Sequence, residues 1–277
     1  MKITAHHCWT VAFLALAGEI CLARVIGEDT RRQPGADEAA LLDTIGLVFC
    51  SREVDGRRRV GAGTGTIVGS RSTVLTAAHV FTDQAGRQGP RVDFDPVSDC
   101  TFRQYDTFGE LIVETGFINF EIGAYRRRAG LPNQDWAVLR TGNPLPNAAL
   151  PFADQGSAID RLSGLPVKIL AFHADLRRDR REAGRMPLVS EGEVFEVVYG
   201  GYTRLAHTAD MERMSSGAAL VYRTDDGQHV VVGINRSAAN LEEFNLAVPL
   251  TSELRQVLRS FAFGLAPDYR LRVAYSR

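Results

Sequence analysis

The chain has 277 residues, a formal net charge of −1, and ordinary shares of charged (23%) and aromatic (8%) residues. This balance creates no global field that would attract nucleic acid, so we expect no nucleic-acid partner. The length suffices for one large or two small domains, and after residue 23 no stretch is long and apolar enough to cross a bilayer.

The first 23 residues have the three zones of a signal peptide. Lys2 lies near the start, residues 8–17 are mainly apolar, and small residues lead to Ala23. A buried N-terminal helix is the alternative, but its apolar positions should alternate with polar ones. We therefore expect export to a secreted or periplasmic location, followed by a polar leader or propeptide at residues 24–43.

Cysteine usage fits export. Removal of residues 1–23 takes away two of the four cysteines and leaves Cys50 and Cys100, on either side of His79 in the sequence. In an oxidising compartment these two can pair, whereas two free buried thiols are the alternative. We expect a Cys50–Cys100 disulfide.

Short β-type segments separated by Gly, Pro, Asn and Asp make up most of the chain, a pattern typical of an all-β sandwich or barrel. The first set is residues 45–49, 60–68, 73–76, 111–122 and 136–140, and the second is residues 167–172, 192–199, 218–222, 230–234 and 244–248. Residues 142–147 contain Pro and Asn and form a linker between the sets. The pattern predicts one β-barrel in residues 44–147 and another in residues 148–277.

The pattern changes after Pro249. Thr251 is a suitable N-cap, apolar residues follow at positions 254, 257, 258 and 261, and Gly264 provides a stop. We expect one C-terminal helix.

His79 follows a glycine-rich stretch (63–68) and an apolar strand ending in Thr76-Ala77-Ala78. A histidine directly after such a strand can be held rigidly with its ring in a cleft, and its titration near neutral pH suits a general base. Isolated histidines in turns are usually surface residues, but the surrounding block favours a catalytic role.

Asp135 opens the apolar strand Trp136-Ala137-Val138-Leu139. A carboxylate there is partly buried and needs a partner, and a histidine N–H would be oriented by it. The alternative is an aspartate that caps a turn.

Ser216 precedes Gly217 and a third apolar strand, which suits a nucleophile activated by a histidine. Ser215 is the alternative; in the family that these blocks resemble, glycine directly follows the nucleophile, and only Ser216 meets that condition.

These three blocks, in the order His, Asp, Ser, resemble the signatures of trypsin-like serine proteases, in particular a bacterial secreted branch related to glutamyl endopeptidases. The resemblance implies two six-stranded antiparallel β-barrels with a C-terminal helix. It also implies a catalytic triad of His79, Asp135 and Ser216, with an acyl-enzyme intermediate. Cys50 and Cys100 have the placement seen in that branch. An α/β-hydrolase would present Ser, Asp, His in that order, with a Gly-x-Ser-x-Gly elbow that this chain lacks.

The resemblance also identifies subsidiary positions, some of which depart from the family pattern. The backbone amides of Met214 and Ser216 correspond to the oxyanion hole, although Met214 stands where the family has glycine. Ser215 replaces the family's aspartate, so an N-terminal amine cannot form the usual activating pair there. Asp210 corresponds to the floor of the pocket for the residue before the cut, where a carboxylate would select Arg or Lys. Asn235 lies on a strand that walls the substrate cleft.

The sequence thus predicts a secreted serine endopeptidase acting on peptide or protein substrates. The alternative is a catalytically weak or inactive domain of the same fold that binds peptides or proteins, which the Met214 departure favours. An unrelated all-β adhesin would explain the strands but not three blocks in family order. No metal-ligand spacing occurs, so we expect no metal or cofactor. The oligomeric state is left open.

Overall fold

The computed structural model describes residues 25–83, 92–123, 132–153, 162–174, 186–199, 202–238 and 243–264. The predicted signal peptide, residues 1–23, lies outside them. Among the helices in these ranges, none has the length and apolar character needed to cross a membrane.

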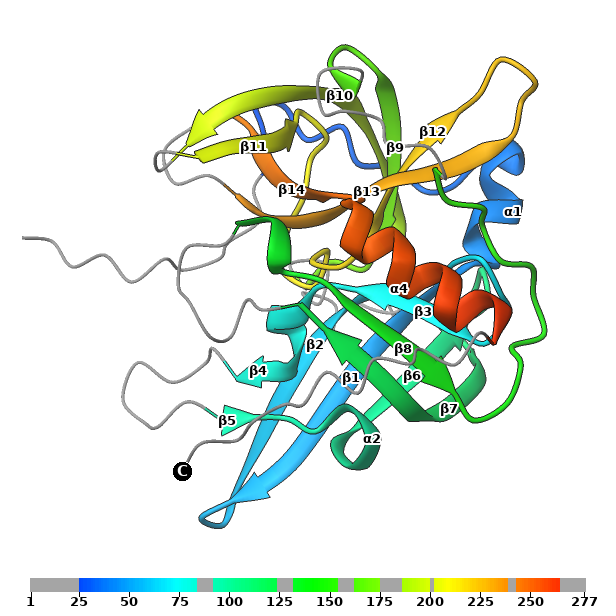
Figure 1. Ribbon diagram of the computed structural model, residues 1–277, viewed down its shortest axis with the longest axis vertical. Coiled ribbons are helices and arrows are strands. Elements are labelled where there is room, and N and C mark those ends of the chain that lie inside the picture. The colour runs from blue at the N-terminus through cyan, green and yellow to red at the C-terminus, as the bar shows by residue number, and fades with distance from the viewer. Residues whose placement is uncertain are drawn as a thin grey trace, which may run out of the picture.

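Two closed β-barrels lie one above the other (Figure 1). The strands of the first are β1 (Ile45–Val54), β2 (Arg57–Ile67), β3 (Thr73–Thr76), β6 (Cys100–Tyr105), β7 (Leu111–Ile122) and β8 (Ala137–Thr141). Their order around the barrel is β1-β2-β3-β8-β7-β6, with every neighbouring pair antiparallel. The short strands β4 (Thr82–Asp83) and β5 (Val92–Asp93) form a separate pair.

The second barrel has the same strand number. Its members are β9 (Pro166–Ala171), β10 (Leu188–Tyr199), β11 (Tyr202–His207), β12 (Ala219–Arg223), β13 (His229–Ala238) and β14 (Asn245–Pro249). They close in the order β10-β11-β14-β13-β12-β9, again antiparallel. The predicted all-β fold of two six-stranded antiparallel barrels with a C-terminal helix is confirmed.

Strands β6 and β11 were not among the predicted segments, because polar residues occupy positions that face inward. Gln104 in β6 is buried, and its side-chain amide donates to the carbonyl of Asp43 at 2.9 Å. Arg204 and His207 are buried in β11. Polar residues at some of the buried positions interrupt the apolar pattern that would reveal each strand, although Phe102 in β6 and Leu205 in β11 are also buried.

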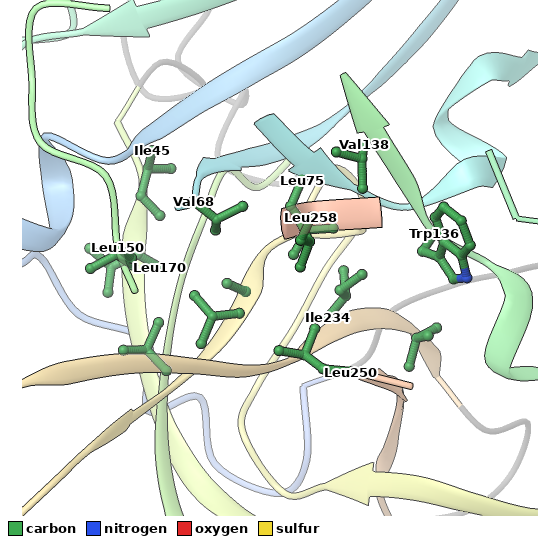
Figure 2. Packing of buried hydrophobic residues seen from close by; sticks show 14 of the residues in the cluster. Ile45, Val68, Leu75, Trp136, Val138, Leu150, Leu170, Ile234, Leu250 and Leu258 are labelled. Atoms are coloured by element: carbon green, nitrogen blue, oxygen red, sulfur yellow. The ribbon is translucent and has the colours of Figure 1, made fainter. Parts of the chain in front are cut away.

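Three hydrophobic clusters organise the interior: one inside each barrel and a third between them. The third joins Leu75 and Val138 of the first barrel to Leu170 and Ile234 of the second (Figure 2). Leu258 of the C-terminal helix packs into the same cluster. The barrels therefore share an apolar seam.

The C-terminal helix α4 (Ser252–Phe263) begins at its predicted cap, where the Thr251 hydroxyl accepts from the Leu254 amide at 3.2 Å. Gly264 ends it with a left-handed backbone. The helix follows the second barrel in sequence but also reaches back to the first, since Arg140 in β8 donates to the carbonyl of Phe261 at 2.7 Å.

The segment before β1, expected to be a polar leader, has definite contacts with the second barrel. Arg32 forms an isolated antiparallel bridge with Val189, with hydrogen bonds of 3.0 and 2.8 Å. The helices η1 (Ala36–Glu38) and α1 (Ala39–Leu42) follow, and Leu41 is buried. Residues 25–43 are thus built into the fold.

The expected Cys50–Cys100 disulfide is present. It connects β1 to β6 at a position where the two cysteines are direct partners in the ladder, with Cα atoms 4.0 Å apart. The short helix α2 (Pro96–Asp99) immediately precedes Cys100.

Candidate active site

Strand pairing brings His79 to Asp135. The 3-10 helix η2 (Ala78–Phe81) follows β3, and η4 (Pro132–Gln134) precedes β8. The pairing of Thr76 with Ala137 places the end of β3 beside the start of β8. His79 Nδ1 consequently lies 2.8 Å from Asp135 Oδ2, and the His79 amide donates to Oδ1 at 3.0 Å.

Asp135 is fully buried, and Arg236 Nε also donates to its Oδ2 at 3.0 Å. Burial opposes ionisation of this carboxyl. The charge and hydrogen bond of His79, together with the charge of Arg236, outweigh that effect and lower the pKa of Asp135 to about 2. The carboxylate is therefore negatively charged at neutral pH and can orient the His79 ring.

Ser216 lies in the turn before β12, in contact with both barrels. Its Oγ donates to the carbonyl of Arg236 at 3.0 Å, and its own carbonyl accepts from the Thr64 amide of β2 at 2.9 Å. Since the Arg236 side chain binds Asp135, one residue contacts both the carboxylate and the hydroxyl. His79 and Asp135 are thus in direct contact, and Ser216 is connected to them through Arg236.

Glycines permit this close approach. Gly217 has φ 91°, and a Cβ there would lie 2.1 Å from Thr76 Oγ1 and 2.3 Å from the Thr64 carbonyl. A Cβ on Gly63 would lie 2.8 Å from the Ser216 carbonyl. The glycine-rich strand and the glycine after Ser216 are therefore required by packing between the barrels.

Thr64 also forms a hydrogen bond with the main chain of Met214. Its hydroxyl donates to the Met214 carbonyl at 2.8 Å and accepts from the Phe172 amide at 3.0 Å. The carbonyl of Arg213 accepts from the Ala174 amide at 2.9 Å. Because N–H and C=O point to opposite sides of a trans peptide, the Met214 N–H is directed away from Ala174. Met214 itself has a left-handed backbone, with φ 75°.

A buried polar network supports the turn from behind. Ser215 is fully buried, and its hydroxyl accepts from Asn235 Nδ2 at 3.0 Å, as does its carbonyl. Asn235 Oδ1 in turn accepts from Nε2 of His207 at 3.0 Å, and desolvation lowers the pKa of His207 to about 4, so the ring is neutral. Asn235 as a substrate-binding residue stays a prediction, and direct contact would require these bonds to open.

Asp210 is buried beneath the N-terminal segment. Its Oδ1 accepts from the Ile26 amide at 2.7 Å, and its Oδ2 accepts from the amide of Thr30 at 2.8 Å and from the Thr30 hydroxyl. The predicted selection of Arg or Lys by Asp210 therefore stays a prediction that requires residues 25–30 to move away.

Sequence reasoning missed three functional positions: Arg236, Thr64 and His207. Arg236 lies in β13 just after the apolar part of that strand, and nothing in the local pattern indicates that its side chain turns back into the protein. Thr64 lies within the recognised glycine-rich stretch, but its role depends on a loop 150 residues away. Across the described ranges, His, Cys, Asp and Glu form no group of three or more suited to holding a metal ion.

Comparison with known proteins identifies a family relationship. The family model described as a trypsin-like peptidase domain matches residues 63–234. No curated protein sequence gives a significant match. A solved structure of a Glu endopeptidase with bound MPD matches at 17% identity and a TM-score of 0.61, covering 86% of this chain and 99% of that one. The protease Anisep from Arthrobacter nicotinovorans matches at 14% identity and TM-score 0.57, with coverages of 79% and 95%. The human heparin binding protein matches at 13% identity and TM-score 0.53, with coverages of 83% and 95%. At these identities the structural matches establish the fold alone.

Proposed function

Because this chain belongs to the family of trypsin-like peptidases, which are serine endopeptidases, we propose that Ser216, His79 and Asp135 hydrolyse peptide bonds through an acyl-enzyme intermediate. The supporting observation is that the buried Asp135 carboxylate binds His79 Nδ1 at 2.8 Å while Arg236 links that carboxylate to the Ser216 hydroxyl. Peptides or proteins are the substrates that this fold implies.

In the first half-reaction, the Ser216 hydroxyl turns from the Arg236 carbonyl toward His79 Nε2 and attacks the substrate carbonyl carbon. His79 accepts the hydroxyl proton, and Asp135 stabilises the resulting imidazolium. The Met214 and Ser216 amides donate to the oxyanion. The tetrahedral species then expels the amine, to which His79 returns the proton, and an ester on Ser216 remains.

In the second half-reaction, water replaces the departed amine. His79 takes a proton from this water as it attacks the ester carbonyl, and the same amides hold the second oxyanion. Collapse releases the carboxylic acid product and returns the proton to Ser216 Oγ. Each residue thus ends in its starting state.

We also propose that the protein works outside the cytoplasm, secreted or periplasmic, after loss of residues 1–23. The Cys50–Cys100 disulfide supports this location, because structural disulfides persist in oxidising compartments.

Covalent labelling tests the nucleophile. The purified protein is treated with an organophosphonate probe and the modified residue is located by mass spectrometry. We expect one adduct on Ser216, and kcat/KM for peptide hydrolysis lower by at least about 10⁴-fold in Ser216→Ala. Ser215→Ala is the matched control: its hydroxyl is buried behind the turn, and labelling of Ser216 should persist.

A peptide-library cleavage profile of the same proteins tests specificity. Because Asp210 is expected to select a basic side chain, we expect Arg or Lys directly before the cut. Folded protein that neither reacts with the probe nor cleaves any peptide would overturn the proposal and leave a peptide-binding module in its place.

A further inference from the structure

Arg236 is a buried cation beside the proposed catalytic carboxylate. It lies at an irregularity in β13, where pairing with β14 shifts between Asn235 and Ser237. Its side chain is 6% exposed, and its Nε shares Asp135 Oδ2 with the His79 ring. A bulge next to a site is a common means of re-aiming a side chain, and here it directs an arginine across the seam into the other barrel.

The main chain of Arg236 contacts the other end of the triad. Its carbonyl accepts the Ser216 hydroxyl at 3.0 Å, and the neighbouring Asn235 carbonyl accepts the Gly217 amide at 2.9 Å. The turn that carries Ser216 and the side chain that binds Asp135 are therefore attached to the same two residues of β13. A displacement of Arg236 would disturb both groups.

The positive charge of Arg236 lies beside the carboxylate that binds the His79 ring. A cation that shares an acceptor oxygen with a histidine repels the protonated form of that ring, and the repulsion is strong where water is excluded. Other charged groups lie on the elements packed nearby: Glu253 of α4 accepts from Gln134 at 2.8 Å, and Glu121 of β7 interacts with Glu253. Among the described groups, His79 and Arg236 are the ones that bind the Asp135 carboxylate directly through their side chains.

We propose that Arg236 is a positioning residue that anchors ionised Asp135 and disfavours protonation of His79, so that the enzyme keeps its general base available at lower pH. The inference rests on the proposed function, since His79 must be the base for the effect to reach catalysis. The same cation weakens the stabilisation of the imidazolium formed during the reaction. Arg236 thus extends the pH range of activity toward acid and lowers the maximal kcat.

The pH profile of kcat/KM tests this role in Arg236→Gln and Arg236→Lys. Glutamine can still donate to Asp135 but has no charge. The acid limb of the kcat/KM profile should therefore move to higher pH by about 1 unit, and kcat/KM near pH 5.5 should fall correspondingly. KM should change by less than about twofold. Lysine keeps the charge and should leave the acid limb within about 0.3 units of the parent. Arg140→Gln is the matched control, since it removes an equal charge from β8 at a side chain directed to α4. Its profile should match the parent.

A second measurement does not depend on activity. NMR titration of the His79 ring in a Ser216→Ala background, with and without Arg236→Gln, follows protonation of the ring directly. Arg236→Gln should raise the midpoint pH of this titration by the same amount as it moves the acid limb of kcat/KM. If the titration moves but neither the parent nor any variant cleaves peptides, the proposed function fails, and the effect of Arg236 on the His79 ring is left without a catalytic consequence. If peptides are cleaved but neither the titration nor the acid limb moves, the inference fails alone.

Folding of each variant is checked by circular dichroism and thermal unfolding. Arg236→Met, an unbranched and uncharged side chain that reaches about as far as the arginine Nε, replaces the glutamine variant if that variant does not fold. An acid limb that moves equally in the lysine and the uncharged variants would also overturn the proposal, because it would assign the effect to shape rather than charge.

Discussion

At the scale of single residues, the backbone and the side chain of Met214 make opposing contributions to stability. Its left-handed backbone costs a non-glycine residue about 1 kcal/mol. The residue is only 9% exposed and packs into the cluster between the barrels, where truncation of a methionine costs about 2–5 kcal/mol. Packing is the larger effect, which explains why a residue other than glycine is tolerated in this turn.

Met214→Gly should therefore destabilise the protein even though it relieves an unfavourable φ. We expect the free energy of unfolding to fall by about 2 kcal/mol, measured by urea denaturation at pH 7. Met214→Leu keeps an apolar side chain on the same backbone and should cost less than about 1.5 kcal/mol. A glycine variant more stable than the parent would show that backbone strain outweighs packing.

At the scale of elements, a covalent cross-link reinforces the closure of the first barrel between neighbouring strands. β1 and β6 are far apart in sequence but adjacent in the barrel, and the Cys50–Cys100 bond spans 50 residues of chain that includes η2 and His79. Such a bond limits the freedom of the unfolded chain, and β1 is also paired along its full length with β2. The disulfide therefore adds stability to a barrel whose strand pairing does not depend on it.

Replacement of both cysteines, Cys50→Ala with Cys100→Ala, should lower the free energy of unfolding by about 3–4 kcal/mol. The measurement is urea denaturation of the variant and the oxidised parent. Because the ladder remains, the variant should keep its native circular dichroism spectrum at 25 °C, and parent protein treated with reductant should resemble it. A loss below about 1 kcal/mol would contradict the assignment of this bond as a stabilising element.

At the scale of the whole molecule, each barrel is contacted by a terminal segment that lies at a distance from it in the sequence. The N-terminal segment crosses the second barrel, held by Asp210 and by an ion cluster in which Arg32 and Lys168 bind Glu38 at 2.7 and 2.5 Å. The C-terminal helix packs at the seam and bonds to β8 of the first barrel. Both segments tie the barrels together, and the first of them covers the carboxylate expected to govern specificity.

The Glu38 cluster predicts that acid lowers the stability of the protein. The Arg32 guanidinium, followed by Lys168 and the Gly35 amide, holds the pKa of Glu38 well below its usual range despite burial. Because the folded state lowers this pKa, the stabilisation is complete at pH values above that usual range and is lost as the pH falls below it. Glu38→Gln should cost about 2 kcal/mol at pH 7, and the gap from the parent should narrow as the pH falls toward 3.

Urea denaturation at pH 7, 5 and 3 measures this gap. Asp37→Asn is the matched control: Asp37 also lies near Lys168, at 3.4 Å, but its side chain is 67% exposed, so its loss should change stability by less than about 0.5 kcal/mol. A gap independent of pH would show that Glu38 stabilises by shape rather than by charge.

Local patterns in the sequence were sufficient for much of the fold. Most strands, the helix capped by Thr251, and the Cys50–Cys100 pair were predicted, because side-chain period, turn residues and capping depend on neighbours within a few positions. The His79, Asp135 and Ser216 blocks could be selected for the same reason, since each is a residue of suitable chemistry next to an apolar strand.

The tertiary structure alone decided which distant groups meet. Arg236 binds Asp135 across 101 residues, and Ile26 binds Asp210 across 184, with no local signal at either end. The inward polar residues of β6 and β11, and the return of α4 to the first barrel, also have no local signal. The physical reason is that a buried polar side chain needs a partner, and barrel closure and strand register determine which partner lies within reach.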